Sequence, residues 1–311
     1  MKIPAALRLS PEWAPYVFIS PFVILFGVFG LFPLLFSLYL AFQTWEPSSG
    51  MAAMSFVGLG NFAFALQDEW FWKSLYNTGW LAITSGVPQH VVAIPLAYFI
   101  HSSFKGLRNV VVGAYFMPYI TSTVAIAILF SSLFSTDYGL VNVGLQGISQ
   151  IPALGWMLPG EPIDWLGNPD NIKPAISMLV FWRYVGFNVV LYLAALQTIP
   201  NDIYEAATMD GAGRIQQFFY ITLPSLKPMI FFGVTLSVIG GLQLFEEPFI
   251  LTGGRGGSDQ AGMTTAIYLY RMAFDFNDFG AASAMSWLLF IVVGMLTWLT
   301  NVAFRPPKSS T

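Results

Sequence analysis

The 311-residue chain contains no cysteine, only two histidines and few charged residues. Without cysteine it can form no disulfide, no thiolate metal site and no cysteine nucleophile. His90 and His101 stand in no HExxH or comparable spacing, so we predict no metal site. The sequence has no GxxxxGK[ST] phosphate-binding loop, and the glycine-rich segment 253–257 lacks its Lys-Ser/Thr ending. We therefore expect no catalytic residues and no cofactor bound to this chain.

The scarcity of charge indicates a membrane protein. Charged residues make up 9% of the chain and hydrophobic residues 56%, whereas soluble domains carry roughly 25% charged residues. The net charge of −3 gives no sign of a nucleic-acid partner. The first apolar run continues far beyond the length of a signal-peptide core, so we expect it to span the membrane rather than to be cleaved.

Six apolar runs are long enough to cross about 30 Å of hydrocarbon, which takes roughly 20 helical residues. In lipid every backbone polar group must be satisfied within the segment, which selects helices. We therefore predict an all-α, polytopic membrane protein with six transmembrane helices. The predicted spans are residues 15–42, 74–100, 109–134, 174–199, 229–251 and 281–304.

The distribution of Lys and Arg predicts the orientation. Eight lie on the side of the two termini and of segment 200–228, four lie on the other side, and Arg183 lies within the fourth span. Because cytoplasmic loops carry the excess of positive charge, both termini are predicted to be cytoplasmic. We expect a tail at 1–14, a single transmembrane domain at 15–304 and a tail at 305–311.

The longest outer loop, residues 135–173, is rich in Gly, Pro and Asn. A connection of this length is usually functional or packed on itself. It is either a docking surface for an external partner or a cap that packs on the helices.

The stretch 205–228, EAATMDGAGRIQQFFYITLPSLKP, is a polar interlude between two apolar spans. Its first three residues favour helix, and a turn is expected at Gly211 because glycine tolerates positive φ. A second short amphipathic run, residues 214–223, is limited by Pro224. The pattern predicts a helix–turn–helix elbow at the membrane surface.

Glu-Ala-Ala, then Asp-Gly-Ala, then Ile-x-Leu-Pro at this spacing resembles the EAA signature of the permease subunits of bacterial ABC importers. The resemblance implies that the coupling loop, residues 200–228, docks on a cytoplasmic ATPase dimer that binds ATP and Mg²⁺. This chain would then be a non-catalytic, multi-pass subunit in the lipid of the bacterial cytoplasmic (inner) membrane. The alternative is an ordinary surface hairpin. The candidate coupling residues are Glu205, Ala206, Ala207, Asp210, Gly211, Ala212, Ile221, Leu223 and Pro224.

Two further segments resemble the first permease subunit of sugar importers of the maltose and glycerol-phosphate type. They are YLAALQTIP at 192–200 and LTGG at 251–254, although relatives often read Gly-Gly-Pro where this chain has GGRGGSDQ at 253–260. The resemblance implies a second homologous permease and an extracytoplasmic sugar-binding protein as partners. The alternatives are an ABC permease for a non-sugar solute and a secondary transporter driven by an ion gradient.

Charges within membrane spans are costly and are candidates for function. Arg183 lies in the fourth span, and Glu246 and Glu247 lie in the fifth. We favour a structural ion pair between Arg183 and Glu246, with sugar ligation as the alternative. Aromatic and small residues of the same spans suit sugar stacking and close approach, which the resemblance also implies for these helices. The candidate pathway residues are Trp182, Arg183, Tyr184, Phe187, Ser237, Gly240, Gly241, Gln243, Glu246 and Glu247.

Overall fold

The computed structural model describes residues 10, 12–103, 108–151 and 161–304. The chain is helical almost throughout, which confirms the predicted all-α class. Within the described residues the only strands are β1 (Gln43–Thr44) and β2 (Ser55–Phe56), which pair antiparallel with Gln43 opposite Phe56. The chain forms two compact units, residues 1–67 with 269–288 and residues 68–268 with 289–311.

The first unit begins with a long apolar helix that contains a π-helical segment. It consists of α1 (Ala14–Phe26), the π-helical Gly27–Leu31 and α2 (Phe32–Leu40). Short 3₁₀ turns lead to α3 (Gly60–Gln67). The buried Asn61 amide on α3 donates to the carbonyl oxygens of Ala41 and Gln43 at 3.0 and 2.8 Å, and so fixes the chain after α2.

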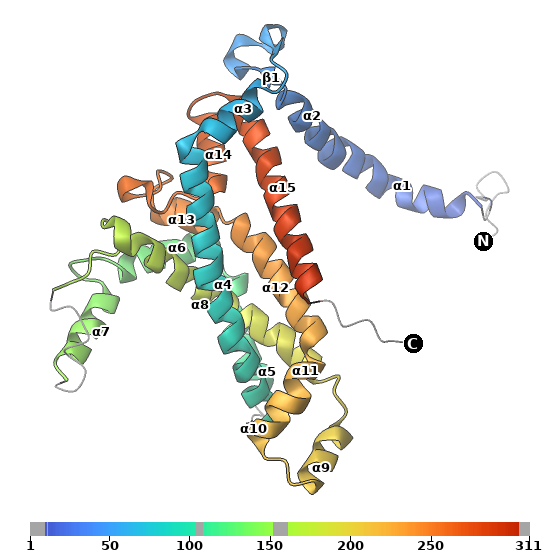
Figure 1. Cartoon of the computed structure of the whole chain (residues 1–311), viewed down its shortest axis with the longest axis vertical. Helices are drawn as coiled ribbons and strands as arrows, with labels where there is room; N and C mark the ends of the chain where they lie inside the picture. The colour runs from blue at the N-terminus through green and yellow to red at the C-terminus, as the bar shows by residue number, and fades with distance from the viewer. Residues whose placement is uncertain (1–9, 11, 104–107, 152–160, 305–311) are drawn as a thin grey trace, which may run out of the picture. The chain divides into compact units, whose positions relative to one another are not determined.

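The second unit holds most of the helices (Figure 1). In chain order they are α4 (Glu69–Ser103), α5 (Arg108–Ile120), α6 (Thr123–Leu133), α7 (Leu140–Ser149), α8 (Pro169–Leu196), α9 (Asn201–Met209), α10 (Arg214–Gln217), α11 (Leu223–Ser225), α12 (Lys227–Leu242) and α13 (Glu246–Leu251). α14 (Thr265–Phe274) and α15 (Phe279–Ala303) are shared between the two units.

The core of the second unit lies between α4 and α8. Near the start of α8, Ile172, Ile176 and Leu179 are fully buried together with Leu81 of α4. Toward its end, Tyr192 and Leu193 pack against the small residues Ala93 and Ala97 of α4, which allow close helix approach. A hydrogen bond of 2.8 Å between the Thr84 and Ser177 hydroxyls joins the same two helices.

Among the described residues, five helical segments are long and apolar enough to cross a membrane, and a sixth span requires joining a bent pair. The five are Ala14–Leu40, Glu69–Ser102, Pro169–Leu196, Lys227–Leu251 and Phe279–Ala303. The span predicted at 109–134 is sharply bent, because Val110–Ile120 and Thr123–Leu133 meet at 92°. Pro118, which cannot donate a backbone hydrogen bond, precedes the break at residues 121–122.

The fifth predicted span is also interrupted. α12 ends at Leu242, and Gln243 and Phe245 leave helical geometry before α13 begins at Glu246. Both glutamates therefore stand in the first turn of a new helix rather than inside a continuous one. The break therefore decides which of the two glutamates faces the protein interior.

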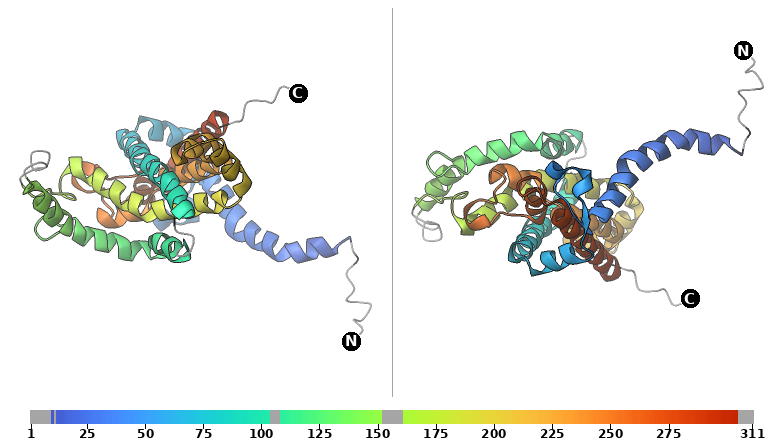
Figure 2. Two further views of the ribbon diagram at one scale, coloured as in Figure 1. Left: turned by 90° about the horizontal axis from the view of Figure 1, so that it is seen from below. Right: turned by 90° about the horizontal axis from the view of Figure 1, so that it is seen from above.

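The segment 135–173 contains α7, the green helix at one edge of its unit in both views of Figure 2. The buried Asn142 of α7 donates to the carbonyl oxygen of Ile163 at 2.9 Å and accepts from the Trp165 indole at 3.1 Å. The Trp165 ring in turn lies against Phe134, at 5.6 Å between centroids. These contacts favour the packed cap over a free docking loop for this part of the segment, and Trp156 lies outside the described residues.

Candidate functional site

The elbow has the helix–turn–helix geometry that the sequence predicts. α9 ends at Met209, and the chain turns through Gly211, whose φ of +81° is in the left-handed region. The Ala212 amide reaches back to the Ala207 carbonyl at 2.9 Å and closes the end of α9. α10 starts after Gly213, whose amide donates to the Gln216 side chain at 2.8 Å. A β-carbon at Gly211 would meet no atom within 4 Å, so glycine is needed there for backbone conformation and not for space.

Three side-chain hydrogen bonds make the elbow rigid. Gln217 of α10 donates to the Thr208 hydroxyl and to the Ala212 carbonyl, each at 3.0 Å. The Tyr204 hydroxyl pairs with the buried Thr222 hydroxyl at 2.9 Å. The two arms of the turn are therefore fixed to each other, and Tyr98 of α4 also donates to the Arg214 carbonyl at 3.3 Å.

The candidate coupling residues follow the exposed outside of this elbow. Glu205, Ala206, Asp210, Gly211 and Pro224 are exposed, whereas Ala207, Ala212, Ile221 and Leu223 are half-buried. A shallow cleft of about 260 Å³ runs along the turn from Asp210 to Ile221.

Sequence reasoning missed three large side chains beside the cleft, Met209, Ile215 and Tyr220, which are 88%, 76% and 80% exposed. Ile215 and Tyr220 are apolar residues of the amphipathic run 214–223, which was the available sequence signal for them, whereas Met209 ends α9 and had no such signal. An exposed apolar knob of this kind is typical of a surface that contacts another protein or a membrane.

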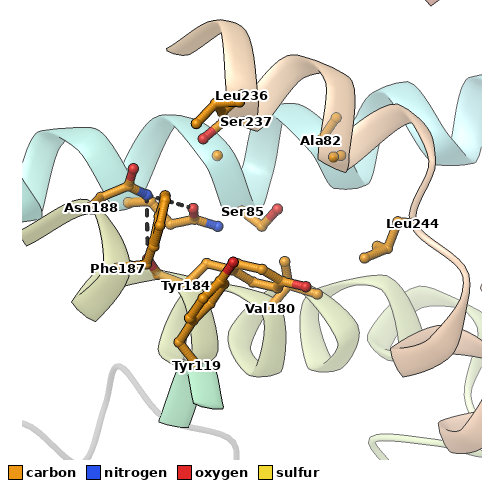
Figure 3. A pocket seen from close by; sticks show the side chains of 14 residues that line it. Ala82, Ser85, Tyr119, Val180, Tyr184, Phe187, Asn188, Leu236, Ser237 and Leu244 are labelled. Atoms are coloured by element: carbon orange, nitrogen blue, oxygen red, sulfur yellow. Dashed lines mark hydrogen bonds between the residues drawn. The ribbon is translucent and has the colours of Figure 1, made fainter. Parts of the chain in front are cut away.

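The second candidate region is a cavity of about 260 Å³ between α4, α8 and α12, which Tyr119 of α5 also lines (Figure 3). It is lined by Ala82, Ser85, Gly86, Gln89, Tyr119, Val180, Tyr184, Phe187, Asn188, Leu236, Ser237, Gly240, Gly241 and Leu244. None of these lining residues carries a charge. The lining instead combines aromatic rings, amides and hydroxyls.

Two buried amides form the polar wall of the cavity. Asn188 of α8 donates to the Gln89 side-chain oxygen at 3.1 Å and to the Tyr184 carbonyl at 3.3 Å, the bonds drawn in Figure 3. This arrangement uses the Gln89 oxygen and the Asn188 amino group. The Gln89 amino group and the Asn188 oxygen remain, one donor and one acceptor, for a bound solute.

The aromatic wall is a small cluster of three rings. Tyr119 stacks on Phe187 with centroids 4.7 Å apart and meets Tyr184 edge-on at 5.8 Å. Figure 3 shows Tyr119 reaching toward the cavity from the side opposite α12. Flat apolar faces beside amide and hydroxyl groups suit a ligand that is apolar on its faces and polar at its edge.

A close approach of α12 to α4 shapes the third wall. A β-carbon at Gly241 would come within 2.9 Å of the Ala82 methyl carbon, closer than van der Waals contact allows. Glycine at this position, with alanine opposite, lets the two helix backbones come together. At the neighbouring Gly240 an added β-carbon would meet nothing within 4 Å, so the side chain missing there leaves open space in the cavity.

A buried ion pair lies beside the cavity. Arg183 of α8 donates to Glu247 of α13 at 2.6 Å, and the two residues are 9% and 2% exposed. The Tyr184 hydroxyl, from a cavity-lining residue, donates to the same Glu247 oxygen at 3.1 Å. The expected pairing of Arg183 with Glu246 is wrong. The break before α13 turns Glu246 outward, where it is exposed, and turns Glu247 inward.

The structure therefore brings together half of the ten candidate pathway residues. Tyr184, Phe187, Ser237, Gly240 and Gly241 line the cavity, and Arg183 and Glu247 pair next to it. The other three do not line it. Trp182 is 41% exposed, with Phe130 beside its ring; Gln243 and Glu246 are exposed at the helix break.

Four polar or aromatic lining residues were missed by sequence reasoning: Ser85, Gln89, Tyr119 and Asn188. The available signal was two amides, Gln89 and Asn188, within otherwise apolar spans, where unpaired polar groups are costly. Across the described residues no group of three or more His, Asp and Glu side chains could hold a metal ion.

Several apolar spans, an exposed elbow and an uncharged cavity together indicate a polytopic membrane protein. The chain belongs to the family of binding-protein-dependent transport system inner membrane components, whose family model matches residues 91–305. It is therefore a non-catalytic, multi-pass component of the inner membrane.

Curated relatives match nearly the whole chain. The lactose transport system permease protein LacF of Rhizobium radiobacter is 36% identical over 94% of this chain and 94% of its own length. The arabinooligosaccharides transport system permease protein AraP of Bacillus subtilis (strain 168) is 34% identical over 92% of this chain and 87% of its own length.

Solved structures share the fold. A chain of a bacterial ABC transporter involved in the import of the acidic polysaccharide alginate superposes with a TM-score of 0.79 at 24% identity, over 96% of this chain and 97% of that one. A second structure, in complex with an alginate pentasaccharide-bound periplasmic protein, gives a TM-score of 0.75 at 25% identity, over 94% of each chain.

Proposed function

We propose that this chain is a permease subunit of an ATP-driven importer of neutral carbohydrates. The observation that carries the proposal is the composition of the cavity, in which aromatic rings, amides and hydroxyls meet and no charged side chain takes part. Sugars offer apolar ring faces to aromatic side chains and hydroxyl groups to amides. The names of the lactose and arabinooligosaccharide relatives agree with this substrate class.

The cavity forms half of the translocation pathway in this proposal, and a second, homologous permease supplies the other half. A binding protein on the outer side delivers the sugar. An importer of alginate, an acidic polysaccharide, shares the fold. We expect the present chain to differ from it in substrate charge, because its own cavity presents no cation to a carboxylate.

The elbow couples this pathway to ATP hydrolysis on a separate ATPase dimer. The exposed Met209, Ile215 and Tyr220 form an apolar knob, and Glu205 and Asp210 supply charge next to it. Hydrogen bonds within the elbow make it rigid enough to transmit a push. Closure of the ATPase dimer would move the elbow as a body and rock the helices that line the cavity.

This coupling requires the elbow to be cytoplasmic. The absence of cysteine allows a direct test with single-cysteine variants and an impermeant maleimide on intact spheroplasts. Cysteine at Asn201, at the start of α9, should react only after permeabilisation, and cysteine at the exposed Tyr138 should react before it. The reverse pattern would exclude a cytoplasmic elbow.

The decisive experiment is ATPase activity of the complex co-purified with this chain, reconstituted in lipid with its binding protein. We would compare lactose, arabinotriose and an alginate oligosaccharide as stimulants. Stimulation by a neutral sugar, and loss of that stimulation in a Gly211→Val variant that still assembles, is the expected result. Stimulation by the alginate oligosaccharide alone would contradict the neutral-sugar assignment, and the absence of a co-purifying ATPase would contradict the function as a whole.

A further inference from the structure

His90 of α4 is a buried histidine that joins three helices. Its Nδ1 lies 2.7 Å from the hydroxyl of Tyr192 on α8, and its Nε2 lies 2.9 Å from the hydroxyl of Ser237 on α12. Tyr192 is fully buried and His90 is 9% exposed. Of the three, only Ser237 lines the cavity between α4, α8 and α12. The histidine is thus not part of this cavity's lining but contacts a residue that is, and His90 and Ser237 both also line a second, mostly apolar space of about 590 Å³ between α4, α12 and the later part of α15.

The hydrogen-bond inventory assigns the imidazole tautomer. A tyrosine hydroxyl has one hydrogen to donate, and within the described part of the chain Nδ1 of His90 is the acceptor found for Tyr192. Burial of that hydrogen without an acceptor would cost free energy. Nδ1 is therefore the unprotonated nitrogen, so in the neutral ring Nε2 carries the proton and donates it to the Ser237 oxygen.

A consequence follows for the Ser237 hydroxyl. Other helical hydroxyls here donate to the carbonyl one turn earlier, as Thr235 does to Phe231 at 2.8 Å and Ser85 does to Leu81 at 2.7 Å. For Ser237 the bond found among the described residues is the one to His90. Because its oxygen accepts from Nε2, its own hydrogen has no acceptor among the described residues and is left for a ligand.

We propose that His90, held by Tyr192, is a positioning residue that makes Ser237 a hydrogen-bond donor toward an oxygen of the transported sugar. The site would then offer a fixed donor from α12 opposite the amide pair Gln89 and Asn188. A ring or hydroxyl oxygen of a neutral sugar is the acceptor that fits. The substrate part of this inference depends on the proposed function, whereas the hydrogen-bond relay itself does not.

The relay is tested first without any substrate. Nitrogen-15 histidine spectra of the assembled complex in lipid distinguish a protonated from an unprotonated ring nitrogen. The His90 signals are identified by their loss in His90→Gln or, where that variant does not assemble, by their change in Ser237→Ala. We expect unprotonated Nδ1 and protonated Nε2, with Tyr192→Phe shifting the first signal and Ser237→Ala the second. A protonated Nδ1 would overturn the assignment.

The transport arm uses the neutral sugar that gives the strongest ATPase stimulation among lactose and arabinotriose. Ser237→Ala should raise its apparent KM about 3- to 10-fold, the effect of one lost hydrogen bond, with little change in maximal rate. Tyr192→Phe should raise KM in the same direction, and adding it to Ser237→Ala should have no further effect because it acts through Ser237. Thr235→Ala, whose hydroxyl donates within its own helix, is the matched control and should leave KM unchanged.

The spectroscopic and the transport experiments can contradict different parts of the proposal. Multiplicative KM effects of Tyr192→Phe and Ser237→Ala would overturn the positioning role while the neutral-sugar function stands. If neither sugar stimulates the ATPase, the proposed function fails, and the tautomer measurement still decides whether the relay exists.

Discussion

The elbow is formed by one short stretch of chain, whereas the cavity is lined by residues from three helices, including Ala82 of α4, Asn188 of α8 and Gly241 of α12. Bonds between near neighbours hold the elbow, such as that of Gln217 to Thr208. The cavity depends on a bond between Gln89 and Asn188, 99 positions apart. One region is therefore defined by local backbone geometry and the other by packing between helices.

Because of this difference, substitutions in the two regions should affect function and stability to different extents. Most elbow side chains are exposed, so a substitution there removes little buried surface and should disturb function more than stability. The side chains around the cavity are enclosed by other helices, so a substitution there should lower the free energy of unfolding as well. The following substitutions test that contrast, in order of decreasing expected effect on stability.

The largest loss of stability is expected from Glu247→Ala. It leaves Arg183 buried without its counter-ion, which typically costs about 3–5 kcal/mol. Thermal unfolding of the purified complex measures the effect. Glu246→Ala, at the exposed neighbour, is the matched control and should change stability by no more than about 0.5 kcal/mol. Equal effects of the two variants would show that the inward and outward positions are misassigned. Replacing both Arg183 and Glu247 by leucine should recover much of the loss, because no unpaired charge remains.

These two glutamates also show where sequence reasoning stops. The sequence identifies Arg183 as a charge that needs a partner, but the choice between adjacent glutamates depends on the break at Gln243 and Phe245. The sequence does carry a signal for that break, because the two glutamates and Pro248 form a typical first helical turn, but the length of the apolar run outweighed it. A helical register extended from α12 therefore selects the wrong residue.

The elbow was predictable because its signals are local: a left-handed turn at Gly211 and a proline at Pro224. For the cavity, the sequence indicated only that the fourth and fifth spans carry residue types that suit a sugar. Gln89 and Asn188 reveal their role when α4 and α8 are side by side. The bend near Pro118 had a signal, the proline itself, but the length and apolar character of the run outweighed it.

The second test compares adjacent glycines of α12. Gly241→Ala places a methyl group against Ala82, and the resulting overpacking should cost about 1–3 kcal/mol. Gly240→Ala meets open space and should be neutral or stabilising by up to about 1 kcal/mol, because alanine favours helix. Denaturation midpoints of the two variants decide the matter. Similar losses at both positions would contradict the close approach of α12 to α4.

The third test moves to the elbow. Gly211→Val forces a β-branched residue to a φ of +81°, a local cost of about 1–2 kcal/mol, and should abolish sugar-stimulated ATPase activity while the complex still assembles. Gly213→Ala, at a φ of −70°, is the control and should keep stimulation. Asparagine at position 211 tolerates positive φ, so it should preserve more activity than valine. A normal response of the valine variant would exclude this turn from coupling.

The smallest expected effect on stability, and the sharpest on substrate, comes from Phe187→Leu. Leucine retains apolar volume but removes the ring that stacks on Tyr119, an aromatic pair worth about 0.5–1.5 kcal/mol. If this wall contacts the faces of the sugar, apparent KM for the stimulating sugar should rise several-fold with little change in maximal rate.

Phe130→Leu is the matched control for that variant. Phe130 lies 5.2 Å from the Trp182 ring in the same unit, and it does not line the cavity. Its loss should lower stability at least as much, because Phe130 is buried, and should leave KM unaltered. A KM shift of equal size in both variants would mean that any loosening of the helices weakens sugar binding, and the aromatic wall would then hold the cavity open rather than recognise its occupant.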